Sequence, residues 1–240
     1  MNLYNTYKDN DFVSIANGKV LMNYTKKWTN NGHTFGEGLI SPDKNHFYIN
    51  IPKNASSSIK QNLLKLNWEF GNVTDYPNAT PIVPLRDPID RWKSGIVEYL
   101  MMYHQQVIFP IVEPNLYKFL PLLGEKLALS LIFDTITFDD HTERQCVFLK
   151  DIDLSTMIFL NVDDEFNKNF SSLLNGIGYN SGYDVLTMEN NSAGSGKSDI
   201  KELFSLIIKK DKHKAKQLRD WFWCDYELME QVKFYESSNK

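Results

Sequence analysis

The sequence has few cysteines and no long hydrophobic run. It holds two cysteines among 240 residues, Cys146 and Cys224, which lie far apart along the chain. So few cysteines argue against a disulfide framework or a zinc site, and we expect two reduced, buried thiols. No apolar run approaches the length of a membrane-spanning helix, and the polar stretch 1–11 lacks the apolar centre of a signal peptide. These absences predict a soluble cytoplasmic protein.

The chain also lacks an excess of basic residues. Its formal net charge is −4, from 26 Lys and Arg against 30 Asp and Glu. A nucleic-acid-binding domain usually carries a broad positive field, so we expect no nucleic-acid partner. An anionic ligand would have to be held by a local cluster of donors instead. The one basic run, 209–216, is expected to be a solvated face of a helix.

Length and composition favour a single domain. With 42% hydrophobic residues, a chain of this length can bury one sizeable core. We predict one domain over 1–240, with an irregular lead-in or small hairpin over 1–45 and a core over 46–235. Apolar residues recur at helical spacing over 104–135 and again from residue 200 onward, which predicts helices there.

The most informative stretch runs from Phe47 to Ile59. The apolar run Phe47–Ile51 predicts a buried strand, and Pro52 ends it because proline cannot donate to a sheet ladder. Ser58 and Gln61 fit a capping box, so a helix should begin near Ser58. Free backbone N–H groups at a helix start attract anions. The turn before this helix adds one ammonium group and three hydroxyl groups, from Lys53, Ser56, Ser57 and Ser58.

A second strand-to-helix junction follows. Ile82–Leu85 predicts a short strand, and it leads through Arg86 into a helix with Asp87 as N-cap and Pro88 at its first position. Ser94 lies eight residues after Arg86. Ligands of open α/β sheets collect at the carboxyl ends of the strands, so the two junctions can share one ligand. Taken alone, the first junction is also compatible with an ordinary serine-rich turn.

Together the two junctions resemble the donor-binding motifs of the sulfotransferases that use 3′-phosphoadenosine 5′-phosphosulfate (PAPS), above all the carbohydrate branch. The resemblance implies a P-loop-like α/β fold, with a parallel sheet flanked by helices and a helical C-terminal portion. It implies that the first motif binds the 5′-phosphosulfate and that Arg86 and Ser94 bind the 3′-phosphate. The residues so assigned in the first motif are Lys53, Asn54, Ala55, Ser56, Ser57 and Ser58.

The resemblance also implies a reaction. PAPS would donate a sulfuryl group to a hydroxyl or amine of an acceptor, a glycan or glycolipid, and 3′-phosphoadenosine 5′-phosphate (PAP) would be the second product. Lys53 would neutralise charge on the leaving oxygen, with no metal required. Related enzymes place the general base between the two motifs, where this chain has no histidine but has Glu69 and Asp75. His141 is the outside candidate, because the segment after it resembles a family motif, with Arg144 in place of proline.

A late loop, 189–198, ends like a Walker A motif with Gly196-Lys197-Ser198. We reject a Walker A site because Asn191 stands where that motif requires glycine. By resemblance this loop closes over the 3′-phosphate through Ser195 and Lys197, and a surface loop ahead of a helix is the alternative. Two other functions stay open: an inactive domain that binds a nucleotide or glycan, and a P-loop-like kinase, which the missing Mg²⁺ ligands disfavour.

Overall fold

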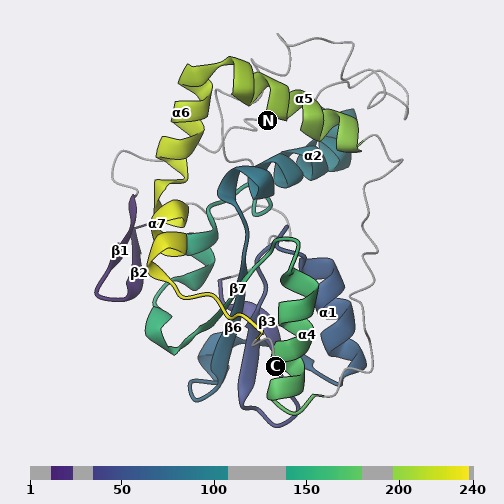
Figure 1. The fold of residues 1–240 in the computed structure, drawn as a ribbon, viewed down its shortest axis with the longest axis vertical. Helices are drawn as coiled ribbons and strands as arrows, with labels where there is room; N and C mark the ends of the chain where they lie inside the picture. Colours follow the sequence, from purple (N-terminus) through teal and green to yellow (C-terminus); the bar gives the residue numbers. More distant parts are fainter. Residues whose placement is uncertain (1–11, 24–34, 108–138, 180–196, 238–240) are drawn as a thin grey trace.

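The computed structural model describes residues 12–23, 35–107, 139–179 and 197–237, which form two sheets and a set of surrounding helices (Figure 1). The strands are β1 (Phe12–Ala16), β2 (Lys19–Asn23), β3 (Glu37–Ile40), β4 (His46–Ile49), β5 (Glu69–Asn72), β6 (Thr80–Leu85) and β7 (Ile158–Asn161). The helices are α1 (Ser56–Lys65), α2 (Pro88–Val107), α4 (Phe166–Gly176), α5 (Lys197–Lys210), α6 (Lys212–Trp221) and α7 (Trp223–Gln231). Short 3₁₀ helices are η1 (Val73–Asp75), η3 (Gln145–Leu149) and η4 (Leu154–Thr156).

The central sheet is mixed, in the order β5-β3-β4-β6-β7. β4, β6 and β7 run parallel, whereas β3 pairs antiparallel with both β4 and β5. An α/β fold with flanking helices is therefore confirmed, although the sheet is only partly parallel. β3 falls within the expected lead-in 1–45, so the central sheet begins at Glu37 rather than at residue 46.

The small hairpin expected in the lead-in is present as β1 and β2. Asn17 and Gly18 connect the strands, with backbone φ of 53° and 69°. Left-handed φ at both central residues is the geometry of a tight two-residue hairpin turn, which Asn-Gly favours. The Leu154 N–H donates to the carbonyl of Gly18 at 2.8 Å, so the hairpin is tied to the main body near η4.

Helices α1 and α4 cover one face of the central sheet, and they lie side by side in Figure 1. Both helices carry apolar residues at helical spacing, and these faces are buried here against the strands. Each large apolar side chain buried in this way contributes roughly 1.5–3 kcal/mol. The helix residues concerned are Ile59, Leu63, Phe166, Phe170, Leu173 and Leu174.

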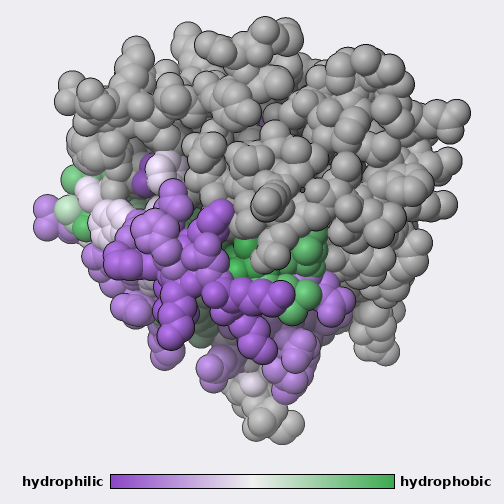
Figure 2. Space-filling model, turned by 90° about the horizontal axis from the view of Figure 1, so that it is seen from above, coloured by the Kyte–Doolittle hydropathy of each residue, from purple (hydrophilic) through white to green (hydrophobic). Residues whose placement is uncertain are grey.

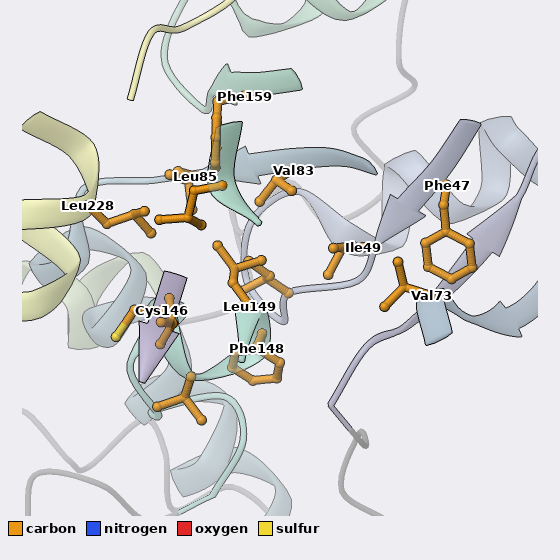
Figure 3. Close-up of a cluster of buried hydrophobic side chains, with 14 of the residues drawn as sticks. Phe47, Ile49, Val73, Val83, Leu85, Cys146, Phe148, Leu149, Phe159 and Leu228 are labelled. Atoms are coloured by element: carbon orange, nitrogen blue, oxygen red, sulfur yellow. The ribbon is translucent and has the colours of Figure 1, made fainter. Parts of the chain in front are cut away.

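The other face of the sheet packs against η3 and α7. Figure 3 shows inward side chains of β4, β6 and β7 meeting those of η3, with Leu228 of α7 beside them. Cys146 and Cys224 both belong to this cluster and are buried free thiols, as expected. Burial raises the pKa of the Cys146 thiol well above its ordinary value, and contact with Cys224 adds to the rise.

Helices α2, α5 and α6 form the upper part of the molecule in Figure 1. Trp92 of α2 meets Phe204 of α5 edge-to-face at 5.8 Å between ring centres. Figure 2 looks down on this end and shows mostly hydrophilic side chains among the described residues, with a smaller hydrophobic area beside them. Most of the basic run 209–216 is exposed, which confirms the expected solvated face. None of the described helices is both long and apolar enough to cross a membrane.

Candidate active site

The Lys53 turn (residues 50–55) connects the carboxyl end of β4 to α1. Two of its residues, Lys53 and Ala55, have left-handed backbone φ of 69° and 57°. This conformation costs non-glycine residues roughly 1–2 kcal/mol each, so the surrounding contacts must hold the turn in place. Backbone turns that include left-handed residues can point several N–H groups toward one anion. The strained geometry therefore lies at the site expected to bind phosphate.

The capping box predicted at Ser58 is wrong. α1 begins at Ser56, with Ala55 as its N-cap and no side-chain cap. Ser58 lies inside the first turn, because the left-handed Ala55 brings the chain into the helix two residues earlier than the sequence pattern indicates. With no capping side chain in place, the N–H groups of the first turn remain the anion-binding groups of a helix N-terminus.

Arg86 joins the two motifs. It follows β6 directly, and its Nη1 lies 3.4 Å from the carbonyl oxygen of Lys53 and 3.3 Å from the hydroxyl of Ser94. The Ser94 hydroxyl in turn donates to the carbonyl of Asp90, one turn earlier in α2. Since β4 and β6 are parallel neighbours, their carboxyl ends meet at one edge of the sheet. The prediction that the two junctions come together is confirmed.

Asn54 bonds to other residues of the protein through its side chain. Its side chain is fully buried, and its Nδ2 donates to the Pro84 carbonyl at 2.8 Å and to Gln145 Oε1 at 2.6 Å. The residue was expected at the donor, but these two bonds make its side chain a support for the Lys53 turn. Gln145 itself was not predicted as a site residue, although it ends the short segment after His141 that resembles a family motif. Its partners are all remote in sequence, so its supporting role could not be inferred from that motif.

Arg91 is a second support that the sequence analysis missed. Its guanidinium is completely buried and donates to the carbonyls of Pro52, Asp140 and Glu143, at 2.8 Å and 3.1 Å for the first two. Burial lowers the pKa of Arg91 to about 10, although nearby carboxylates such as Asp225 partly oppose this. Arg91 therefore fastens the Lys53 turn to the segment 139–145. The available signal in the sequence was its place in the first turns of the predicted helix, directly before Trp92.

His141 lies near α2, but it is held between two aspartates. Its Nδ1 is 3.0 Å from Asp139 and 3.1 Å from Asp140. Burial alone would lower the pKa of His141, but the two carboxylates outweigh it and raise that pKa to about 9. An imidazolium that is already protonated at neutral pH cannot accept a proton, which argues against His141 as a base. The three ligand atoms lie within 4.8 Å of one another, a spacing that an acidic cluster can reach without holding a metal.

The backbone of His141 touches α2 beside Ser94. A Cβ atom added at Gly95 would lie 2.1 Å from the carbonyl oxygen of His141. No side chain can be accommodated there without moving the two segments apart, so glycine permits this close approach. The segment 139–145 is thereby fixed against the helix that carries Ser94.

The two expected carboxylates lie away from Lys53. Glu69 on edge strand β5 is opposite Ile40, and its Oε2 is 2.9 Å from Lys44 Nζ in the turn before β4. That is the amino end of β4, whereas the Lys53 turn is at its carboxyl end. Asp75 is exposed in η1, beyond the edge strand. The structure does not bring either side chain to the Arg86–Lys53 contact.

Glu98 is the carboxylate that the structure places against Lys53. Its Oε2 lies 3.2 Å from Lys53 Nζ, and the two side chains are 28% and 23% exposed. Sequence analysis did not select Glu98, although it follows Ser94 by one helical turn and so shares its face of α2. The predicted donors of the late loop are not placed: Ser195 lies outside the described residues, and of Lys197 only the backbone, at the start of α5, is described.

No protein-family model, no curated protein and no solved structure matches the chain. The function therefore has to be inferred from the site itself. The start of α1, Lys53, the Arg86 guanidinium and the Ser94 hydroxyl all lie near the carboxyl ends of β4 and β6, and groups of this kind can bind an anion.

Proposed function

We propose that this chain is a PAPS-dependent sulfotransferase with a P-loop-like α/β core. It would move a sulfuryl group from PAPS to a hydroxyl or amine of a carbohydrate acceptor, free or on a lipid, and release PAP. The observation that carries the proposal is the position of Arg86, whose guanidinium reaches both the Lys53 turn and Ser94. This contact supports the proposal because it brings together two motifs that are separate in sequence and that would hold the two phosphate groups of one nucleotide.

The residues of the site suit the donor. The 5′-phosphosulfate would bind at the start of α1, to the N–H groups and hydroxyls of Ser56, Ser57 and Ser58 and to Lys53. Arg86 and Ser94 would hold the 3′-phosphate, and Ser195 and Lys197 remain proposed further donors to it. Arg86 suits a phosphate because its guanidinium presents several N–H donors in one plane.

The proposed chemistry is mainly positioning and charge neutralisation. In-line transfer of a sulfuryl group resembles phosphoryl transfer, in which the protein orients two oxygens and stabilises charge on the leaving one. Lys53 would stabilise that charge from its place in the turn. Fixed donors are effective here because they need no reorganisation during the reaction. The supports Asn54, Gln145 and Arg91 would keep these donors in position.

Calorimetric titration with PAP, adenosine 5′-phosphate and ATP tests the proposal. We expect PAP to bind at least about tenfold more tightly than adenosine 5′-phosphate, because only PAP carries the 3′-phosphate. Transfer of ³⁵S from labelled PAPS to a panel of glycans, glycolipids and small alcohols tests the activity. PAP binding without transfer to any acceptor would favour an inactive nucleotide-binding domain. Phosphoryl transfer from ATP would favour a kinase.

A further inference from the structure

Glu98 faces the ammonium group of Lys53 from the middle of α2. The ion pair measures 3.2 Å and is partly exposed on both sides, so a ligand can reach it. Ser94, one turn earlier on the same helix face, contacts Arg86. One face of α2 therefore presents a hydroxyl toward Arg86 and a carboxylate toward Lys53.

We propose that Glu98 is the general base of the transfer reaction, an inference that rests on the sulfotransferase function proposed above. A general base has to come within about 2.6–3.2 Å of the oxygen whose proton it takes. If Lys53 meets the leaving oxygen, a carboxylate that contacts Lys53 Nζ lies close to the reacting centre. Because the acceptor lies on the opposite side of sulfur, the proposal requires the carboxylate of Glu98 to leave Lys53 and turn toward the acceptor when the donor binds.

In the proposed step, the carboxylate of Glu98 takes the hydroxyl proton while the acceptor oxygen forms its bond to sulfur. The bond between sulfur and the 5′-phosphate oxygen breaks, and its electron pair stays on that oxygen, where Lys53 stabilises the charge. The products are a sulfate ester, PAP and protonated Glu98, which returns its proton to water. The step needs no oxidant or reductant.

The protein contains a matched control for this pair at the other end of β4. Lys44 also has a left-handed backbone φ, 61°, and it also forms an ion pair with a glutamate, Glu69, at 2.9 Å. In both pairs a lysine with left-handed backbone φ binds a glutamate. The two lysines lie at opposite ends of β4. Only the Lys53–Glu98 pair lies beside Arg86 and the start of α1.

The test compares Glu98→Gln, Glu98→Asp and the control Glu69→Gln. Conversion of PAPS to PAP is followed in a single turnover at saturating PAPS, with methyl β-galactoside and with water as acceptors. We expect Glu98→Gln to slow the reaction by about 10²–10⁴-fold, the usual contribution of a general base. Glu98→Asp should keep more activity than Glu98→Gln, because it retains a carboxylate, and Glu69→Gln should match the wild type.

Calorimetric PAP affinity supplies a readout that does not depend on turnover. Glu98→Gln should bind PAP about two- to fivefold more tightly than the wild type, since Lys53 no longer has to leave a partly exposed ion pair. Weaker PAP binding by this variant would overturn the proposal, as would wild-type turnover. A Glu98→Asp protein slower than Glu98→Gln would also overturn it, because side-chain shape would then matter more than proton acceptance.

Failure of the inference and failure of the proposed function give different results. A wild-type protein that does not bind PAP refutes the sulfotransferase function itself. A wild-type protein that binds PAP but transfers sulfate to no member of the acceptor panel refutes Glu98 as a base and leaves the nucleotide site standing. A loss of turnover in Glu69→Gln equal to that in Glu98→Gln refutes the assignment to Glu98 alone.

Discussion

The side-chain amide of Gln145 holds both backbone polar groups of Arg86, although the two residues are 59 positions apart. Gln145 Oε1 accepts from the Arg86 N–H at 3.0 Å, and its Nε2 donates to the Arg86 carbonyl at 2.7 Å. The same Oε1 accepts from Asn54 at 2.6 Å. Asp225 fixes Gln145 in turn by accepting from its N–H. One buried side chain thus bonds to the Arg86 backbone of the second motif and to the Asn54 side chain of the first.

Replacing Gln145 with alanine should therefore destabilise the protein. The substitution removes one buried and two partly buried hydrogen bonds and leaves the Arg86 backbone and Asn54 without these partners, so we expect a loss of about 2–4 kcal/mol in the free energy of unfolding. Urea denaturation measures this loss. Gln231→Ala is the control, because Gln231 is exposed in α7 and should change stability by less than about 0.5 kcal/mol. Similar stabilities for the two variants would contradict the proposed support.

Arg86→Ala should weaken PAP binding selectively. The variant loses a charged hydrogen bond to the 3′-phosphate, which contributes about 1.5–3 kcal/mol, so PAP affinity should fall about tenfold or more. Affinity for adenosine 5′-phosphate, which lacks that phosphate, should change much less. Ser94→Ala should show the same selectivity with a smaller effect, since it removes a neutral donor. Calorimetric titration with both nucleotides measures these affinities. An equal loss of affinity for PAP and for adenosine 5′-phosphate would mean that Arg86 supports the structure of the site and does not bind the 3′-phosphate.

The local features of the fold could be predicted from the sequence. Asp87 caps α2 as expected, accepting from the Asp90 N–H at 2.8 Å, because a cap depends on a few adjacent residues. In α4 four apolar residues recur at helical spacing in the sequence, and all four are buried, because helical periodicity marks the buried face directly. The carboxyl ends of two parallel strands also had to meet, which placed Arg86 near the Lys53 turn.

Features that depend on remote contacts could not be predicted. Strand β3 has four residues and no alternating pattern, and its place is fixed by packing: a Cβ at Gly38 would lie 1.8 Å from the Tyr48 carbonyl. The helix start at Ala55 could not be predicted from capping residues. Alanine avoids the left-handed conformation unless the surroundings impose it. The Lys53–Glu98 pair joins a turn to a helix 45 residues later, and no periodicity connects them.

Lys53→Ala should abolish most transfer while leaving the fold intact. Alanine can keep the left-handed backbone as well as lysine does, and the Lys53 side chain is partly exposed, so the unfolding free energy should change by less than about 1 kcal/mol. Removing a group that stabilises developing charge typically slows turnover about 10²–10³-fold. Single-turnover assays with PAPS measure the rate. Lys44→Ala is the matched control at the opposite edge, and equal turnover in the two variants would contradict the role of Lys53.

His141 should make the stability of the protein depend on pH in the alkaline range. Its pKa is about 9 in the folded state, against about 6.5 for an ordinary histidine, so folding favours the protonated ring. The stabilisation is fully present below about pH 6.5 and is lost as the pH rises through about 9. His141→Gln should therefore cost about 2–4 kcal/mol more at pH 6 than at pH 9.5, as measured by urea unfolding.

His213→Gln, at an exposed histidine of α6, is the control variant for this prediction. Subtracting the unfolding free energy of each variant from that of the wild type at the same pH cancels the contribution of titrating groups that the substitution leaves unaffected. The His141 ring can also be followed directly by NMR, where the midpoint should lie near pH 9. A midpoint below about pH 7 would show that Asp139 and Asp140 do not hold the proton on the ring. His141 could then accept a proton at neutral pH and would return as a candidate base beside Glu98.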